Sequence, residues 1–315
     1  MRKTTAFIIV LLLFFLCACT DAEEIGADYG RLSIVCSDFP AYDLTREICG
    51  EKANVHLLIK PGAELHSFEP TPKDIIRIQN CDLFICNGGE SEEWIEELLD
   101  ADELREVNII RMMDCVETVE EEITDGMYVR GEEEEEEEEP ELDEHVWTSP
   151  LNAVKIVSEI CKAVCGIDSD NARYYTVCTE AYISQLTELD AAFRAAVKNA
   201  ARDTLIFADR FPMRYFTLEY GLEYYAAFPG CSTETEASAK TVAFLIDRVR
   251  ESKTPAVLYL EFSNEKMADI ICEDTGCKKL PFFSAHNITA EQFESGCGYL
   301  ELMYQNLSSL KEALG

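Results

Sequence analysis

Short apolar runs alternate with amphipathic segments along most of the chain. In the first half, the apolar runs have the length and composition of strands, and the segments between them carry apolar residues at helical spacing. Strands are expected at Arg31–Cys36, Val55–Ile59, Asp82–Cys86 and Val107–Arg111, with helices at Tyr42–Cys49, Thr71–Gln79 and Glu92–Asp100. Regular alternation of strands and helices predicts an α/β lobe with a mainly parallel sheet.

The second half repeats this alternation. Strands are expected at Leu205–Phe207, Tyr224–Phe228, Ala256–Leu260 and Leu280–Phe283, and helices at Pro212–Tyr220, Ala239–Glu251, Lys266–Thr275 and Gly298–Leu314. Between the halves, a helix is expected at Pro150–Val164 and one long helix at Asp170–Ala200, which would span roughly 45 Å. We therefore expect an N-terminal lobe at 31–165, a long linking helix within 166–202 and a C-terminal lobe at 203–315.

The N-terminus has the pattern of an export signal. Basic residues at Met1–Lys3 precede an unbroken apolar run at Ala6–Leu16, which is short for a transmembrane helix. The run leads into Leu16–Cys19, which resembles a bacterial lipobox with Cys19 as the lipidated residue. Residues 1–19 are expected to be a lipoprotein signal peptide and residues 20–30 a flexible tether, with the protein anchored by lipid to the membrane at the bacterial cell surface or in the periplasm. The alternative is a plain secretion signal.

Charge narrows the classes of partner. The 315 residues carry a net charge of −34, which argues against nucleic acid because phosphate binding needs a cationic face. Glu132–Glu139 is an unbroken glutamate run within an acidic stretch, 131–144, that is expected to be disordered. It is either a solvated loop or a loop that collects cations close to His145.

Cysteine is frequent, with fourteen residues, of which twelve remain after Cys17 and Cys19 are set aside. In an exported protein some of these can pair, and Cys272 with Cys277 is the first candidate because of their proximity. The sequence has no CxxC motif, which argues against a structural zinc site built from cysteines.

Two of the four histidines lie in similar loops. His66 stands in LLIKPGAELHSFEPTP (57–72) and His145 in DEHVWTSP (143–150). Each precedes a hydroxyl residue followed by proline, a pattern typical of a helix N-cap with proline at the first helical position. In parallel α/β sheets, loops at the carboxyl ends of strands carry the ligand sites. The two imidazoles are therefore predicted to bind a metal ion.

Longer motifs resemble a known family over residues 31–315: PGAELHSFEPTPKDI (61–75), NGGESEEWIEELL (87–99), HVWTSPLNA (145–153), RYFTLEYGL (214–222), STETEAS (232–238) and YLELMYQNLSSLKEAL (299–314). Together they resemble the zinc- and manganese-binding lipoproteins that serve ABC transporters. The resemblance implies two α/β lobes joined by a long helix, one metal ion between the lobes, a permease as partner and no enzymatic activity.

The resemblance also implies the metal ligands. His66 and His145 match the first two. The third position falls on Arg210, a departure, because a guanidinium has no lone pair for a metal. His286 is read as a substitute ligand, with Glu261 as the first choice for the fourth position and Asp209 as the second. Arg210 is expected to pair with a carboxylate such as Asp209 or Glu236.

Three imidazoles and one oxygen favour Zn²⁺ as cargo, with Mn²⁺ as the alternative. His56, inside a predicted strand, is interpreted as structural.

A metalloenzyme is a rival interpretation, but the sequence has no HExxH motif. A surface adhesion protein is a second rival, and a monomer is expected.

Overall fold

The computed structural model describes residues 30–63, 68–100, 104, 107–127, 141–230 and 237–315. The predicted signal peptide with Cys19, the metal-ligand candidate His66 and the glutamate run lie outside these residues. Residues 32–315 form one compact unit. Within the described part of the chain, no helix is long and apolar enough to cross a membrane.

The first lobe contains a four-stranded parallel sheet, as predicted, and its strand order is β2-β1-β3-β4. Helices α2 and α5 cover one face of this sheet, and α3 and α4 cover the other. The strands are β1 (Leu32–Cys36), β2 (Ala53–Leu57), β3 (Leu83–Cys86) and β4 (Ile109–Arg111); the helices are α2 (Phe39–Cys49), α3 (Pro72–Gln79), α4 (Glu93–Asp100) and α5 (Pro150–Ile167).

The second lobe repeats the plan with a parallel sheet in the order β6-β5-β7-β8. Helices α7 and α11 pack on one face, and α8 and α9 on the other. The strands are β5 (Thr204–Phe211), β6 (Glu223–Pro229), β7 (Ala256–Tyr259) and β8 (Lys278–Pro281); the helices are α7 (Arg214–Tyr220), α8 (Ala239–Ser252), α9 (Lys266–Thr275), α10 (Ala290–Ser295) and α11 (Tyr299–Leu314).

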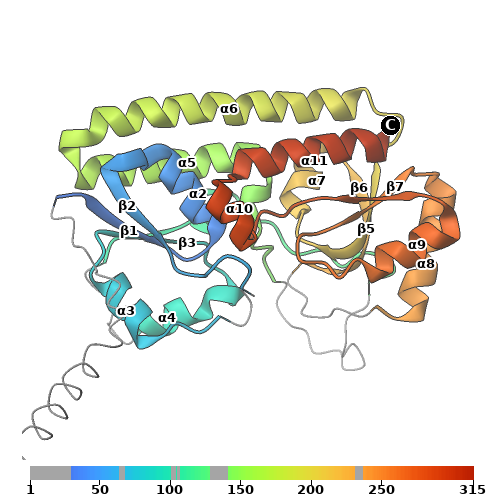
Figure 1. Cartoon of the computed structure of the whole chain (residues 1–315), viewed down its shortest axis with the longest axis horizontal. Helices are drawn as coiled ribbons and strands as arrows, with labels where there is room; N and C mark the ends of the chain where they lie inside the picture. Colours follow the sequence, from blue (N-terminus) through green and yellow to red (C-terminus); the bar gives the residue numbers. More distant parts are fainter. Residues whose placement is uncertain (1–29, 64–67, 101–103, 105–106, 128–140, 231–236) are drawn as a thin grey trace, which may run out of the picture. The chain divides into compact units, whose positions relative to one another are not determined.

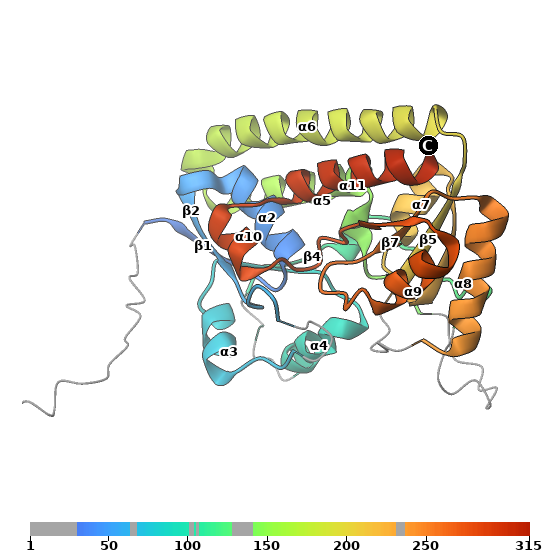
Figure 2. The same cartoon turned by 45° about the vertical axis from the view of Figure 1, so that its right-hand side comes forward.

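The predicted long helix is α6 (Ala172–Lys198), which runs alongside α5 and α11 in both views (Figures 1 and 2). It starts two residues later than expected, because Ser169–Asn171 form a 3-10 turn capped by the side chain of Asp168. Buried side chains from both sheets and from α6 belong to one continuous core, which includes Ile34, Leu189 and Phe207. A shared core of this kind limits how far the lobes can move apart without exposing apolar surface.

Strand β5 is the element that differs most from prediction. The apolar run suggested an end at Phe207, but the strand continues through Asp209 and Arg210 to Phe211. Its pairing with β6 shifts register between Phe207 and Arg210. Such bulges re-aim side chains and are frequent beside functional sites. The polar pair thus belongs to a strand that the hydrophobic pattern alone would have ended.

Candidate metal centre

Residues at the carboxyl ends of β5 to β8, the loop after β2 and the turn before α5 border one cavity of about 150 Å³. It is lined by Gly62, Ala63, His145, Arg210, Pro212, Gly230, Leu260, Glu261, Phe262, Ser284, His286 and Asn287. Gly62 and Ala63 come from the first lobe, and the residues from Arg210 onward come from the second. The cavity therefore lies where parallel α/β sheets place their ligand sites.

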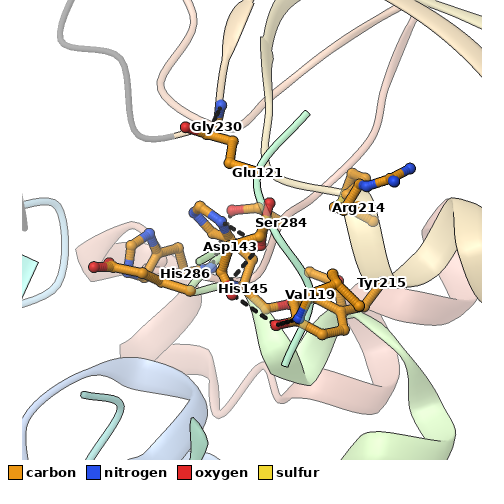
Figure 3. A network of polar contacts seen from close by, with 12 residues as sticks. Val119, Glu121, Asp143, His145, Arg214, Tyr215, Gly230, Ser284 and His286 are labelled. Carbon is orange, nitrogen blue, oxygen red and sulfur yellow. Dashed lines mark hydrogen bonds and ion pairs between the residues drawn. The ribbon is translucent and has the colours of Figure 1, made fainter. Parts of the chain in front are cut away.

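Two of the predicted ligands meet in this cavity. The rings of His145 and His286, which are far apart in the sequence, lie 5.3 Å apart between centroids at an interplanar angle of 83° (Figure 3). His145 is 1% exposed. Gly230 itself passes close to His145, because a Cβ at that position would lie 3.2 Å from His145 Cε1 and 3.0 Å from the carbonyl oxygen of Phe211.

Asp143 orients His145. Its Oδ1 accepts the backbone N–H of His145 at 2.9 Å and lies 3.2 Å from the ring Nδ1 (Figure 3). Burial lowers the pKa of His145, but the charge and hydrogen bond of Asp143, with Glu144 and Glu121, outweigh burial and leave that pKa raised. A carboxylate on Nδ1 leaves Nε2 as the nitrogen for a metal, which is the usual outer-shell arrangement of a ligating histidine.

Contacts from both lobes hold the segment around His145. In the first lobe, Asn87 Nδ2 donates to the carbonyl of Glu144 at 2.9 Å, and the backbone N–H of Ser91 donates to the Glu144 carboxylate at 2.8 Å. In the second lobe, the hydroxyl of Tyr215 donates to the carbonyl of Asp143 at 2.7 Å. The 3-10 turn at Val146–Thr148 then leads into α5, where Ser149 is the N-cap, as predicted.

His286 lies in a turn that Glu261 organises. The Glu261 carboxylate accepts the N–H and the hydroxyl of Ser284, at 2.8 Å and 2.5 Å, and the N–H of His286 at 3.3 Å. Burial raises the pKa of Glu261, although these hydrogen bonds oppose the rise. Glu261 faces the cavity as expected, but both of its oxygens already hold this turn.

Asp209 was the second choice for the fourth ligand, but it does not line the cavity. Its Oδ1 accepts the backbone N–H of Arg210 at 2.9 Å, and its Oδ2 accepts the N–H of Leu260 at 3.3 Å, which ties β5 to β7. Arg210 does line the cavity. Its predicted partner Asp209 contacts it through the backbone, and the other suggested partner, Glu236, lies outside the described residues.

His66 also lies outside the described residues, but the chain just before it is fixed. Asn287 Nδ2 donates to the carbonyls of Lys60 at 3.2 Å and Ala63 at 2.8 Å, which links the two lobes beside the cavity. His56 lies elsewhere, with its Nε2 2.6 Å from Arg77 Nη1, in keeping with a structural role. Among the described residues, no three His, Cys, Asp or Glu side chains are grouped as a metal site.

Sequence reasoning missed Asp143 and Asn287 as parts of the site. Asp143 stood next to the glutamate run and was counted with it, although its spacing of two residues from His145 was a usable signal. The sequence allows Asn287 or Thr289 as the cap of the helix that follows, and Thr289 is the cap of α10. Both act through contacts that depend on the folded chain.

Comparisons with known proteins identify the family of the chain. The family described as "ZnuA: Zinc-uptake complex component A periplasmic" matches residues 34–313. The High-affinity zinc uptake system protein ZnuA of Bacillus subtilis is 32% identical over 314 residues, which cover 98% of this chain and 96% of that protein. The Zinc-binding lipoprotein AdcA of Streptococcus pneumoniae is 30% identical over 313 residues and 99% of this chain. The chain spans only 61% of the length of AdcA.

Solved structures show the same fold. The Zn(II)-bound ZnuA-like domain of Streptococcus pneumoniae AdcA matches with a TM-score of 0.74 and 28% identity over 90% of this chain and 99% of that domain. The metal-dependent lipoprotein YcdH of Bacillus subtilis gives 0.75 and 29%, with the same coverage. A laminin-binding adhesin of Streptococcus agalactiae gives 0.75 at 24% identity, which bears on the fold alone. On the family match and these relatives together, the chain belongs to the ZnuA family, that of component A of zinc-uptake complexes.

Proposed function

We propose that this protein is the extracytoplasmic solute-binding component of a metal ABC transporter, which captures Zn²⁺ between its lobes and delivers it to a membrane permease. The observation that carries the proposal is the meeting of His145 and His286 in one cavity. Membership of the ZnuA family and the zinc named for its relatives support the choice of cargo.

The proposed ligands are His66, His145 and His286, with an oxygen as the fourth donor. His66 follows Gly62 and Ala63, which line the cavity, by a few residues in the sequence, which supports its place among the proposed ligands. Imidazole suits Zn²⁺, whereas Mn²⁺ prefers oxygen donors. Glu261 remains a candidate for the fourth position, although its contacts with Ser284 and His286 favour a positioning role.

Delivery implies a membrane location and a partner. The proposed anchor is a lipid on Cys19, in line with the word lipoprotein in the names of relatives. The proposed partner is the permease, and the proposed unit is a monomer with lobes at 31–165 and 203–315.

Because both sheets share one core, the proposed closure is a small tilt of one lobe with ordering of loops at the cavity. We also propose that the protein has no enzymatic activity, because the family to which it belongs is one of uptake components.

Metal titration tests the proposal. The chain without its first 19 residues is stripped of metal, and Zn²⁺ and Mn²⁺ are titrated by calorimetry into the wild type, His145→Ala and His286→Ala. We expect tight 1:1 zinc binding that falls by at least about 100-fold in each variant, since each removes a ligand. His56→Ala is the matched control and should bind zinc like the wild type. Absence of tight binding of either metal to the wild type would contradict the capture function.

A further inference from the structure

Four cysteines gather where three helices meet, at a distance from the cavity. Helices α2, α5 and α6 pack against one another (Figures 1 and 2). The last residue of α2, two residues near the end of α5 and one in α6 are cysteines: Cys49, Cys161, Cys165 and Cys178. Because α5 starts beside the cavity at Pro150, the stretch to Cys161 places these thiols roughly 17 Å further along the helix.

Two of the thiols have the spacing of ligands on one metal ion. The Sγ atoms of Cys161 and Cys165, here called the thiol pair, lie 3.9 Å apart. The two residues are four positions apart on α5, so their side chains lie on the same face of the helix. Two sulfurs bound tetrahedrally at about 2.3 Å from one ion would be about 3.8 Å apart. Both side chains are half-buried, which leaves the pair accessible to a small ion.

Tyr174 connects the other two thiols. Its hydroxyl is hydrogen-bonded to Cys178, which follows one turn later on α6. The same hydroxyl lies directly over Gly50, where a Cβ would overlap it, and Gly50 follows Cys49 in the chain. On the other side of the group, the Sγ of Cys165 lies 3.5 Å from the carbonyl oxygen of Ala172 at the start of α6. The start of α6 therefore closes over the end of α5 and the end of α2.

The thiols also act on one another electrostatically. Burial raises the pKa of Cys49 to about 12, and the charges of the other three thiols add to the rise. Burial and the contact with its neighbour on α5 likewise raise the pKa of Cys165. The charge of Asp168 acts in the same direction on both thiols, although Lys52 acts on Asp168 in turn. Such thiols stay protonated at neutral pH, so only a strongly thiophilic ion displaces their protons.

The number of donors already in place selects the kind of ion. In the part of the chain that the structure describes, no three His, Cys, Asp or Glu side chains are grouped as a metal site. A structural Zn²⁺ needs four donors, whereas Cu⁺ is soft and is satisfied by two or three thiolates. The thiol pair supplies two, and a rotation of a neighbouring cysteine side chain would supply the third.

We propose that the thiol pair, with a further sulfur from Cys49 or Cys178, is a second metal site that takes a soft monovalent cation of the Cu⁺ class. Each binding thiol loses its S–H bond and gains a bond from sulfur to the metal, the proton passes to solvent, and the oxidation state of the metal does not change. The site is separate from the zinc cavity, and the inference does not depend on the proposed function.

Competition for Cu⁺ tests the proposal. The chain without its first 19 residues is titrated under argon with the coloured bicinchoninate complex of Cu⁺. We expect one Cu⁺ per chain to be withdrawn, and the affinity to fall at least about 100-fold in the double variant Cys161→Ser/Cys165→Ser, which loses two ligands. Cys272→Ser/Cys277→Ser is the matched control, because it removes another close pair of thiols, 3.5 Å apart, and it should keep the tight site. Equal Cu⁺ affinity of the wild type and of the Cys161→Ser/Cys165→Ser variant would overturn the inference.

Alkylation of the wild type locates the ion even if the double variant does not fold. Iodoacetamide is applied with and without one equivalent of Cu⁺, and the modified cysteines are identified by mass spectrometry of peptides. We expect Cu⁺ to protect Cys161 and Cys165, while Cys115, a half-buried thiol outside the cluster, is alkylated in both samples. Protection of Cys272 and Cys277 alone would assign the ion elsewhere and reject this site. His145→Ala should bind Cu⁺ like the wild type, so a failure of zinc binding leaves this inference standing.

Discussion

The indole Nε1 of Trp147 donates a hydrogen bond of 2.8 Å to the backbone carbonyl of Ser284. Trp147 follows His145 by two residues, and Ser284 precedes His286 by two. The Trp147 ring also lies 5.6 Å from the His145 ring and 5.0 Å from the His286 ring, between centroids. One buried side chain therefore holds together the two segments that carry the imidazoles.

Trp147→Phe tests this link, because it removes the N–H and leaves the Ser284 carbonyl unsatisfied. We expect the free energy of unfolding to fall by about 1–3 kcal/mol and zinc affinity to weaken, since both histidines lose a common support. Trp94→Phe is the matched control: Trp94 packs on Phe68 and Phe84, and its Nε1 has no hydrogen-bond partner among the described residues. Denaturant titration and calorimetry measure both variants. Equal effects of the two substitutions would contradict the linking role.

Asp143→Asn tests the orientation of His145. The amide that replaces the carboxylate lacks the charge that supports the His145 ring, so we expect zinc affinity to drop by about 10–100-fold. Competition with a chelator measures the affinity, and Tyr215→Phe is a comparison that removes only the hydroxyl donor to the Asp143 carbonyl. Unchanged zinc affinity in Asp143→Asn would show that His145 needs no carboxylate partner.

Glu261→Gln distinguishes a metal ligand from a positioning residue. An amide keeps the size of the side chain, but its NH₂ group cannot accept from the Ser284 N–H. A positioning role predicts a loss of about 1–3 kcal/mol in unfolding free energy even without metal, with a moderate loss of zinc affinity. Thermal melting of the metal-free protein decides. Full stability without metal, combined with lost zinc binding, would instead favour direct ligation.

Glu92 is expected to make the free energy of unfolding depend on pH. It is buried in the first lobe, where its carboxylate accepts the N–H of Gly88 at 2.7 Å. Burial, together with the charge of Glu144, raises its pKa from 4.5 to about 7, despite opposing hydrogen bonds. The folded state therefore binds this proton more tightly than the unfolded state, so the stabilisation is present below about pH 4.5 and is lost as pH rises through 7.

Glu92→Gln should remove this dependence. We expect the change in unfolding free energy between pH 5 and pH 8 to differ between wild type and variant by roughly 1–3 kcal/mol, with the variant favoured at the higher pH. Glu97→Gln, on the exposed face of α4, should follow the wild type. Parallel pH profiles of wild type and Glu92→Gln would rule out the raised pKa.

The sequence singled out Cys272 and Cys277 as a pair, and their sulfur atoms lie 3.5 Å apart as free thiols. Oxidised glutathione would take two electrons from them as both lose a proton, and we expect a disulfide worth about 2 kcal/mol for so short a loop. Burial, together with the hydrogen bond and charge of Cys277, raises the pKa of the Cys272 thiol to about 12. The reacting thiolate therefore becomes more abundant as pH rises, and the reaction should become faster. Loss of 2 Da with protection from alkylation is the readout. Cys161 and Cys165, 3.9 Å apart on one helix, are the comparison pair and should stay reduced.

The order of elements followed from the sequence, because the period of apolar residues is a local property. Both parallel sheets, the long helix and the caps at Thr71 and Ser149 were predicted and are confirmed. The loop before the capped helix α5 also pointed to the cavity, because it carries His145 and its cap and proline are read within a few residues. The zinc family was likewise recognisable from motifs that are continuous in the chain.

Tertiary structure decided which side chains share the site. His145 and His286 are brought together with the help of the Trp147–Ser284 hydrogen bond, which joins residues more than one hundred positions apart, and Gly230 leaves room beside His145. The extension of β5 through Asp209 and Arg210 depends on a neighbouring strand that supplies hydrogen bonds to a polar segment. Whether Glu261 faces a metal or a turn depends on which donors lie within 3.5 Å of its carboxylate. Those donors, from Ser284 and His286, are brought to it by packing within the second lobe rather than by any pattern along the chain.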